Sequence, residues 1–217
     1  MAALERVDHL VVAAPDLEQG VAWVEARLGA RLLPGGRHPA WGTRNAVLPI
    51  GPSTYLEVIA PDPERSDPDL PSLFGIDRLR EPGLVAWAAQ GSDIEQTVSH
   101  LRERGVRLGE PRAGGRVRPD GSRLSWVLTD PAALDPDALL PFLIDWGESE
   151  HPAAFWDGQV RLMLLCAEHP DPPSLLSKLA ALGLDMPVSR APYASLVARL
   201  RCPAGEIELR RPADTGE

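Results

Sequence analysis

The chain has 217 residues, 44% hydrophobic and 24% charged, which argues against wholesale disorder or a fibrous architecture and allows a substantial core. Its 31 acidic and 22 basic side chains give a formal charge of −9, which repels a phosphate backbone and argues against nucleic acid as a partner. The first residues lack the order of a signal peptide, and no apolar run approaches the ~20 residues that span a bilayer. We therefore expect a cytoplasmic protein without a membrane partner, in which Cys166 and Cys202 are free thiols.

A pattern of strand, cap, helix and terminating glycine begins near the N-terminus. Segment 7–13 alternates like a strand, and the residues after Pro15 show apolar side chains at helical spacing as far as Gly29. Asp16 and Gln19 have the spacing of a capping box, in which the carboxylate accepts an amide of the first helical turn. The first unit therefore predicts a strand followed directly by a capped helix.

The same pattern occurs twice more along the chain. The residues at positions 16, 18 and 19 recur unchanged 77 positions later, after a strand predicted over 84–90. A third copy runs from a strand over 160–166, through Asp171 and Pro172 as cap and first helical residue, to Gly183. Three such units indicate a repeated module.

Strand candidates follow each predicted helix, over 45–50 and 54–60, 123–129 and 140–146, and 193–201 and 206–210. Each unit is therefore interpreted as β-α-β-β-β, with the least distinct strand directly after the helix. This predicts an α+β protein. Its expected modules are residues 1–65, residues 66–155 with a loop insertion, and residues 156–217 as a partial third βαβββ repeat.

A family resemblance is carried by Asp8–Val12, the helix start Pro15–Leu17, the run Gly35–Asn45 and the strand Tyr55–Pro61. With these residues the chain resembles the vicinal oxygen chelate superfamily, in particular its glyoxalase-like domain proteins of the glyoxalase, bleomycin-resistance and dioxygenase type. The resemblance covers 5–63, continues less closely over 83–153 and thins beyond 158. It implies paired βαβββ modules forming a curved mixed-sheet cup, a small-molecule ligand in that cup, and a homodimer.

Strand parity brings two polar side chains to that cup. Side chains alternate across a strand, so His9 lies opposite Leu10 and Val12, and Glu57 lies opposite its own apolar neighbours. If the apolar sets pack on the helix, His9 and Glu57 face the cup together. Metal-containing members of the superfamily supply one His and one Glu here, so the resemblance implies a divalent ion (Zn, Fe, Mn, Ni or Mg) bound by His9 and Glu57.

The second module offers fewer donors at the matching positions. The 77-residue offset places Ala86 where a second His9 would stand, and Trp87 reaches the cup only if the strand bulges. The counterpart of Glu57 is Leu143 or Asp145, of which only Asp145 can bind a metal. A catalytic ion normally takes three or more protein ligands, so the third ligand is left open between His38 and Asp145.

Further candidates come from the run Gly35–Asn45, which combines glycine with aromatic and hydrogen-bonding side chains as binding sites do. His38 is a candidate general base or metal ligand. Glu57 is a candidate catalytic carboxylate, because a buried glutamate needs a partner. The alternative for the aromatic residues is a core position. The predicted ligand-binding residues are Trp41, Thr43, Asn45, Tyr55, Trp87, Trp126 and Asp145.

Two functions follow from these observations. The first is a small-molecule enzyme of lyase, isomerase or dioxygenase type, in which a divalent ion in the cup acts as Lewis acid. The alternative is a metal-free small-molecule binding or sequestering protein of the bleomycin-resistance type. The pairing of His9 with Glu57 favours the enzyme, whereas the missing donors of the second module favour the binding protein.

Overall fold

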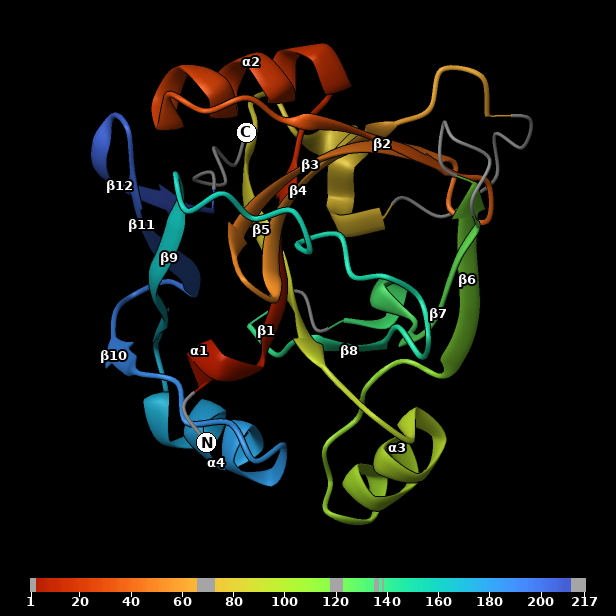
Figure 1. The fold of residues 1–217 in the computed structure, drawn as a ribbon. Helices are drawn as coiled ribbons and strands as arrows, with labels where there is room; N and C mark the ends of the chain where they lie inside the picture. The colour runs from red at the N-terminus through yellow and green to blue at the C-terminus, as the bar shows by residue number, and fades with distance from the viewer. Residues whose placement is uncertain (1–2, 66–72, 118–122, 135–136, 138, 212–217) are drawn as a thin grey trace.

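The computed structural model describes residues 3–65, 73–117, 123–134, 137 and 139–211, in which two β-sheets form the frame of the molecule (Figure 1). The larger sheet has eight strands in the order β2-β3-β4-β1-β5-β8-β7-β6, and the smaller has four in the order β10-β9-β11-β12. The larger sheet curves around a central space, with helices α2 (Leu17–Leu28) and α3 (Ile94–Glu103) on its outer side. The predicted α+β cup is thereby confirmed.

The first module forms one half of the curved sheet. Its helix α2 begins after Asp16, whose carboxylate accepts the amide of Gln19, and ends at Gly29, which adopts the left-handed φ of 65°. The short helix α1 (Ala3–Arg6) leads into its first strand. The strands are β1 (Val7–Ala13), β2 (Leu33–His38), β3 (Thr43–Gly51) and β4 (Thr54–Pro61).

The second module repeats this arrangement as the other half. It pairs in the order β5-β8-β7-β6, which mirrors β1-β4-β3-β2, and the antiparallel pair β1–β5 joins the halves. The strands β2 and β6 are therefore the two outer edges of the curved sheet. The elements are β5 (Gly83–Gln90), α3, β6 (Pro111–Val117), β7 (Arg123–Thr129) and β8 (Phe142–Asp145), with the 3-10 helices η1 (Leu73–Arg78) and η2 (Pro131–Ala133) in the connections.

The third unit keeps the β-α-β-β-β order along the chain and forms the partial repeat that was predicted, although its strands pair differently. Its first strand lies between the second and the third, whereas the first strand of each other module pairs with that module's last strand. The elements are β9 (Arg161–His169), α4 (Pro172–Ala181), β10 (Val188–Arg190), β11 (Ser195–Cys202) and β12 (Gly205–Arg210).

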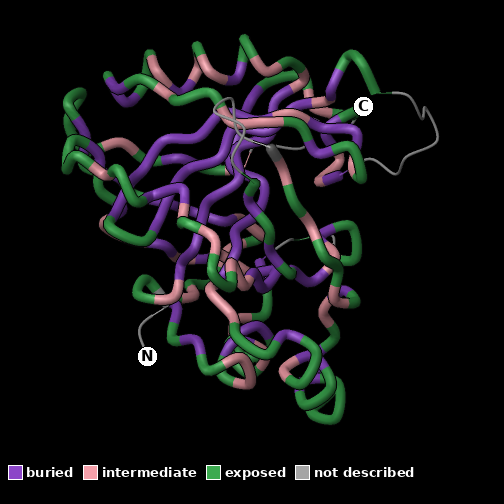
Figure 2. Tube along the Cα trace, turned by 45° about the vertical axis from the view of Figure 1, so that its right-hand side comes forward, coloured by how far each residue is buried: buried purple, intermediate pink, exposed green. Residues whose placement is uncertain are grey.

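Buried residues are concentrated in the strands of the curved sheet (Figure 2), and their side chains form separate clusters on its two faces. One cluster fills the outer side and joins Leu10 and Leu56 to residues of α2, α3 and the third unit, such as Leu165 and Leu200. A second cluster, including Val11 and Ile59, lies on the concave side. Because the third unit packs against the outer face, it leaves the concave face open to form the cup.

Two further expectations concern the whole chain. Within the described residues, no helix combines the length and the apolar character needed to cross a bilayer. Cys166 and Cys202 are both free thiols, as predicted, and Cys202 is the more buried.

Candidate functional site

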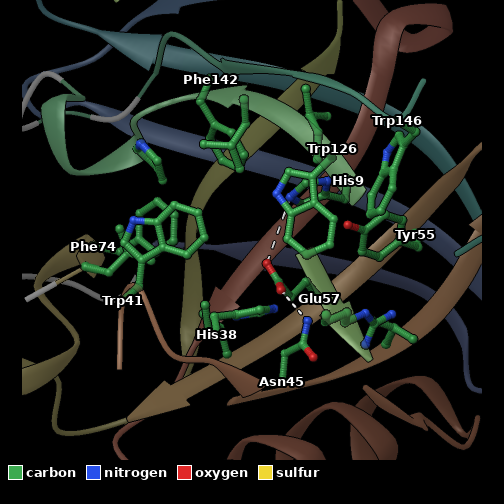
Figure 3. A pocket seen from close by; sticks show the side chains of 17 residues that line it. His9, His38, Trp41, Asn45, Tyr55, Glu57, Phe74, Trp126, Phe142 and Trp146 are labelled. Atoms are coloured by element: carbon green, nitrogen blue, oxygen red, sulfur yellow. Dashed lines mark hydrogen bonds and ion pairs between the residues drawn. The ribbon is translucent and has the colours of Figure 1, made fainter. Parts of the chain in front are cut away.

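The concave side of the curved sheet holds a small cavity of about 50 Å³ that opens to solvent. Both modules contribute to its wall. His38, Asn45 and Glu57 lie along one side, and Phe142 lies on the opposite side (Figure 3). The aromatic lining residues are Trp41, Tyr55, Phe74, Trp126, Phe142 and Trp146.

Strand β1 brings two successive polar side chains to this site because it bulges. Val7 pairs with Ala89 and His9 with Ala88, so Asp8 is the extra residue of β1. As a result Val7 packs in the outer core while His9 lines the cavity. The bulge lets Asp8 and His9 bond each other, with Asp8 Oδ1 2.7 Å from His9 Nδ1.

Asp8 is fully buried and accepts hydrogen bonds from three separate residues. Besides His9, Trp146 Nε1 lies 3.0 Å and His151 Nε2 3.1 Å from Asp8 Oδ2. A carboxylate only accepts, so each histidine presents an N–H to it, and the amide of Ala153 bonds the other nitrogen of His151. Burial alone would raise the pKa of Asp8, but the bonds from His151 and His9 more than offset it, so the pKa lies below its ordinary value.

The bond to Asp8 also decides which nitrogen of His9 faces the cavity. Because Nδ1 donates to Asp8, Nε2 of the neutral ring carries a lone pair, and it lies 3.9 Å from Glu57 Oε2. The His9 ring stacks on Tyr55, with centroids 4.6 Å apart, and meets the edge of Phe142 at 5.2 Å. His9 and Glu57 therefore face the cup together, as strand parity predicts.

Glu57 is itself held in place from β3. Asn45 Nδ2 donates to Glu57 Oε1 at 2.5 Å, while Asn45 Oδ1 accepts the amide of Gly36 at 2.8 Å. A side chain at Gly35 would collide with Asn45, so the glycine at this position allows the amide to lie across β2. Asn45 thereby fixes one carboxylate oxygen and leaves the other toward His9.

His38 is a second buried imidazole in the cavity wall, with Nδ1 3.1 Å from Thr43 Oγ1. Burial lowers its pKa; the carboxylate of Glu57 opposes this, and the charge of Arg116 adds to it. The ring is therefore neutral near pH 7. Burial, with the charges of Asp8 and Glu57, raises the pKa of Tyr55 well above its usual range, so its phenol stays protonated.

Most of the predicted site residues meet at this cavity, although their roles remain predictions. Thr43 does not line the cavity and instead holds His38. The sequence-predicted residues that line it are His9, His38, Trp41, Asn45, Tyr55, Glu57 and Trp126.

Trp87 is a correction to the predicted ligand-binding set. It pairs with Leu10 across β1–β5, lies with it in the outer core, and is fully buried there. Its Nε1 donates to the carbonyl of Leu139 at 3.0 Å. The bulge in β1 leaves the alternation of β5 unchanged at this residue, so Ala86 and Ala88 face the cup instead.

Asp145 is a second correction. Phe142 and Ile144 line the cavity, so the intervening alternation turns Asp145 away, and its Oδ1 accepts the amide of Gly147 at 2.9 Å. Val11 pairs with Glu57, and its counterpart Ala88 pairs with Phe142. Phe142 is therefore the residue that corresponds to Glu57, and the sequence assignment to Leu143 or Asp145 was one residue out of phase.

The donor set does not fit a resident divalent ion. The second-module positions that face His9 and Glu57 carry Ala86, Ala88 and Phe142, none of which has a donor atom. Within the described ranges no three His, Cys, Asp or Glu side chains converge, so His38 does not complete a set. Two protein donors fall short of the three that catalytic ions usually take.

Several site residues were missed by sequence reasoning. The sequence did not predict Asp8 as a site residue, because strand alternation alone places its side chain on the face opposite to His9. His151 belongs to a recognised stretch of the second module, but nothing local indicates that it reaches β1, 143 residues away. Arg116 and Phe74, which line the cavity, carried no motif.

One solved structure shares this fold over most of both chains. A hypothetical protein from Staphylococcus aureus superposes with a TM-score of 0.64 at 18% identity, covering 94% of this chain and 84% of that one. Methylmalonyl-CoA epimerase from Mycobacterium tuberculosis gives a TM-score of 0.45 at 25% identity, over 68% of this chain and 91% of the other. A hypothetical protein from Bacillus halodurans gives 0.43 at 19% identity, over 67% and 96%. No match was found among curated proteins.

One family model covers most of the sequence. The model described as "Glyoxalase-like domain" matches residues 7–183, which include all strands of the two modules that enclose the cavity. The structure shows the paired βαβββ modules that the resemblance implies. The chain therefore belongs to the glyoxalase-like domain family.

Proposed function

We propose that the protein is an enzyme of isomerase type that moves a proton on a small carbonyl compound bound in the cup, with His9 as the base. One observation carries this proposal. His9 is fixed by buried Asp8 through Nδ1 and presents Nε2 to the cavity, 3.9 Å from Glu57. A base, the group that orients it and a second titratable group are the usual parts of general acid–base catalysis.

The proposed proton transfer needs no reactant besides the substrate. Nε2 of His9 takes a proton from the carbon next to the carbonyl, and the electron pair moves to the carbonyl oxygen. Asp8 stabilises the imidazolium that forms, and Arg116 in the cavity wall supplies positive charge for the oxygen. The proton then passes from His9 to the adjacent Glu57, which returns it to a different carbon or to the other face.

A metal-dependent reaction finds less support in the side chains. The dioxygenase alternative needs a redox-active ion, and His9 with Glu57 offers only two protein donors. If an ion takes part, exchange activity will be lost on dialysis against a chelator and restored by one added metal.

A binding protein without catalysis is the second candidate, because six aromatic side chains line the cavity. In that case His9 and Glu57 orient the ligand through hydrogen bonds. The homodimer expected from the resemblance stays a prediction under either function.

Hydrogen–deuterium exchange separates the candidates. The protein is incubated in deuterated buffer with a 2-oxo acid, a 1,2-dicarbonyl and an acyl thioester, and the carbon-bound proton next to each carbonyl is followed by NMR. We expect exchange of at least one class by the wild type and by His100→Gln, whose histidine is exposed on α3, but not by His9→Gln. Binding by saturation transfer without exchange would instead support the binding protein, and exchange by His9→Gln would contradict its role as base.

A further inference from the structure

We infer that Phe74 sets the size of the ligand that the cavity accepts and limits it to a carbonyl compound of a few carbon atoms. This inference deepens the proposed function, on whose site it rests, by naming a residue that determines specificity. Phe74 belongs to the 3-10 helix η1, in the connection between β4 and β5, and lines the cavity (Figure 3). It lies outside the pair His9 and Glu57, to which the proton transfer is assigned.

The cavity is small for the number of side chains around it. Its volume of about 50 Å³ has room for roughly four water-sized groups, since one such group needs about 10–15 Å³. Sites for drug-sized ligands usually measure about 300–1,000 Å³. A ligand that lies inside the cavity is therefore a molecule of a few non-hydrogen atoms, and the side chains of the wall set this limit.

Phe74 lies where the cavity meets solvent, because its side chain is half-buried and yet forms part of the cavity wall. Its ring packs against the cluster on the concave side of the sheet. The ring of Phe142 lies beside it, with centroids 6.2 Å apart and planes inclined by 34°. Removal of the Phe74 ring would therefore leave a space of about phenyl size next to Phe142.

The backbone at Phe74 has a conformation that phenylalanine rarely adopts. Its φ is 55° and its ψ is 16°, in the left-handed region, where Cβ comes too close to the following carbonyl oxygen. Among the described residues other than glycine, only Asp93 shares a positive φ, which the short polar side chain of aspartate tolerates. Gly75 follows with a φ of 68°, so η1 contains a short left-handed turn.

Buried residues on both sides hold this turn in place. Leu73 and Ile76 are buried in the cluster on the concave side, and the carbonyl of Ile76 accepts the amide of Leu79 at 3.2 Å. A strained backbone persists only where its surroundings fix it, and such residues gather at binding sites. Glycine at position 74 would relieve the strain but would bring no ring to the cavity. The strained conformation therefore indicates that the Phe74 ring serves the cavity.

Two methyl ketones of different size test this role. Butan-2-one carries an ethyl group on its acetyl group, whereas acetophenone carries a phenyl ring. NMR titrations of the full chain, followed at the ring signals of His9 in the cavity, should show the wild type binding acetophenone more weakly. Its larger apolar surface would otherwise favour acetophenone. In Phe74→Ala the order should reverse, and the ratio of the two dissociation constants should change by about tenfold or more.

Phe155→Ala is the matched control, because it removes the same ring from a side chain that is 70% exposed. Its ratio should equal that of the wild type, and Phe74→Leu should lie between the wild type and Phe74→Ala. The inference is overturned if the wild type binds acetophenone as tightly as butan-2-one, if neither ketone shifts His9, or if Phe74→Ala keeps the wild-type ratio. The wild type and Phe74→Leu decide the matter if the alanine variant does not fold.

The strain at position 74 is tested without any ligand. Glycine normally destabilises a protein relative to alanine, because it increases the entropy of the unfolded chain. At a φ of 55° the order should reverse, so Phe74→Gly is expected to unfold at a higher urea concentration than Phe74→Ala. A higher midpoint for Phe74→Ala would contradict the strained backbone on which the inference rests.

Binding is measured without turnover, so the two proposals fail separately. Selection of ligand size by Phe74 without exchange of a carbon-bound proton would support the inference and contradict the proposed reaction. Exchange that depends on His9, together with a ratio of affinities that Phe74→Ala leaves unchanged, would support the reaction and contradict the inference.

Discussion

The two modules of the cup share one strand order but offer opposite chemistry. The first module contributes His9, His38 and Glu57 to the cavity, and Asn45 holds the carboxylate. The second module has Phe142 at the position that matches Glu57, and alanines where β5 faces β1. The difference shows that two copies of one module can take different roles: the first carries the groups that can transfer a proton, and the second, apart from Arg116, contributes mainly apolar side chains.

The largest effect is expected from substituting each of the two matching positions, Glu57 and Phe142, in turn. Glu57→Gln should lower kcat by about 10²–10⁴-fold with a nearly unchanged KM, because a group that transfers protons is lost while the shape is kept. Phe142→Leu should raise KM and leave kcat within a few fold. Steady-state kinetics on a substrate found by the exchange assay measures both, and a fall of kcat in Phe142→Leu alone would break the proposed division.

The next largest effect concerns Asp8, the buried carboxylate of the first module that orients His9. Asp8→Asn should destabilise the protein by about 3 kcal/mol in urea unfolding, because a fully buried carboxylate with three donors is replaced by an amide that brings its own N–H groups among them. The wild type should also lose stability in acid as the pH falls through the lowered pKa of Asp8, whereas above its ordinary value of 3.8 this stability is fully present. A variant as stable as the wild type at pH 7 would contradict the role of Asp8.

A smaller effect on stability is expected from Gly114, which lies under the Trp126 indole in the second module. Gly114→Ala should cost about 2 kcal/mol, because the added methyl group forces the Trp126 indole off the β6 backbone. Gly147→Ala, where the added methyl group meets no neighbour, measures the backbone strain of a positive-φ glycine, which Gly114 does not have, and so gives an upper limit for the part of the loss that is not steric. Urea unfolding gives the free energies, and tryptophan fluorescence reports whether the indole has moved.

The smallest effect tests whether water is excluded from the buried His38 ring. Burial holds the pKa of His38 below its ordinary 6.5, so between the folded pKa and 6.5 the unfolded chain binds a proton that the native protein does not. Stability should therefore rise with pH over this window, by at most about 1.4 kcal/mol per pH unit. His38→Gln should flatten that part of the curve, and His100→Gln should not; an unchanged slope in His38→Gln would mean that water reaches the ring.

The sequence was sufficient for the architecture because its signals are local. Apolar spacing, Asp16 as cap and Gly29 as terminator define a helix within a few turns, and alternation defines β4 with Glu57 on the correct face. The strand directly after the first helix was the least distinct in the sequence, because two adjacent glycines, Gly35 and Gly36, conceal the pattern of β2.

The site was predicted in part because its remaining features depend on register between distant strands. The bulge at Asp8 turns a residue that alternation assigns to the outer face toward the cup. The pairing of β8 with β5 brings Phe142 to the cavity where the sequence suggested Asp145. Which side chains of a short strand face the cavity, and where a strand bulges, cannot be determined from one sequence. Such shifts are set by pairing with β1 and β5, which the sequence alone does not display.

The junction at Asp8 also constrains how the chain matures on the ribosome. Asp8 emerges early, whereas its donors Trp146 and His151 follow 138 and 143 positions later. Until they arrive, two of the three donors to this carboxylate are missing. The carboxylate that orients His9 therefore gains its full set of donors only when both halves of the cup are present.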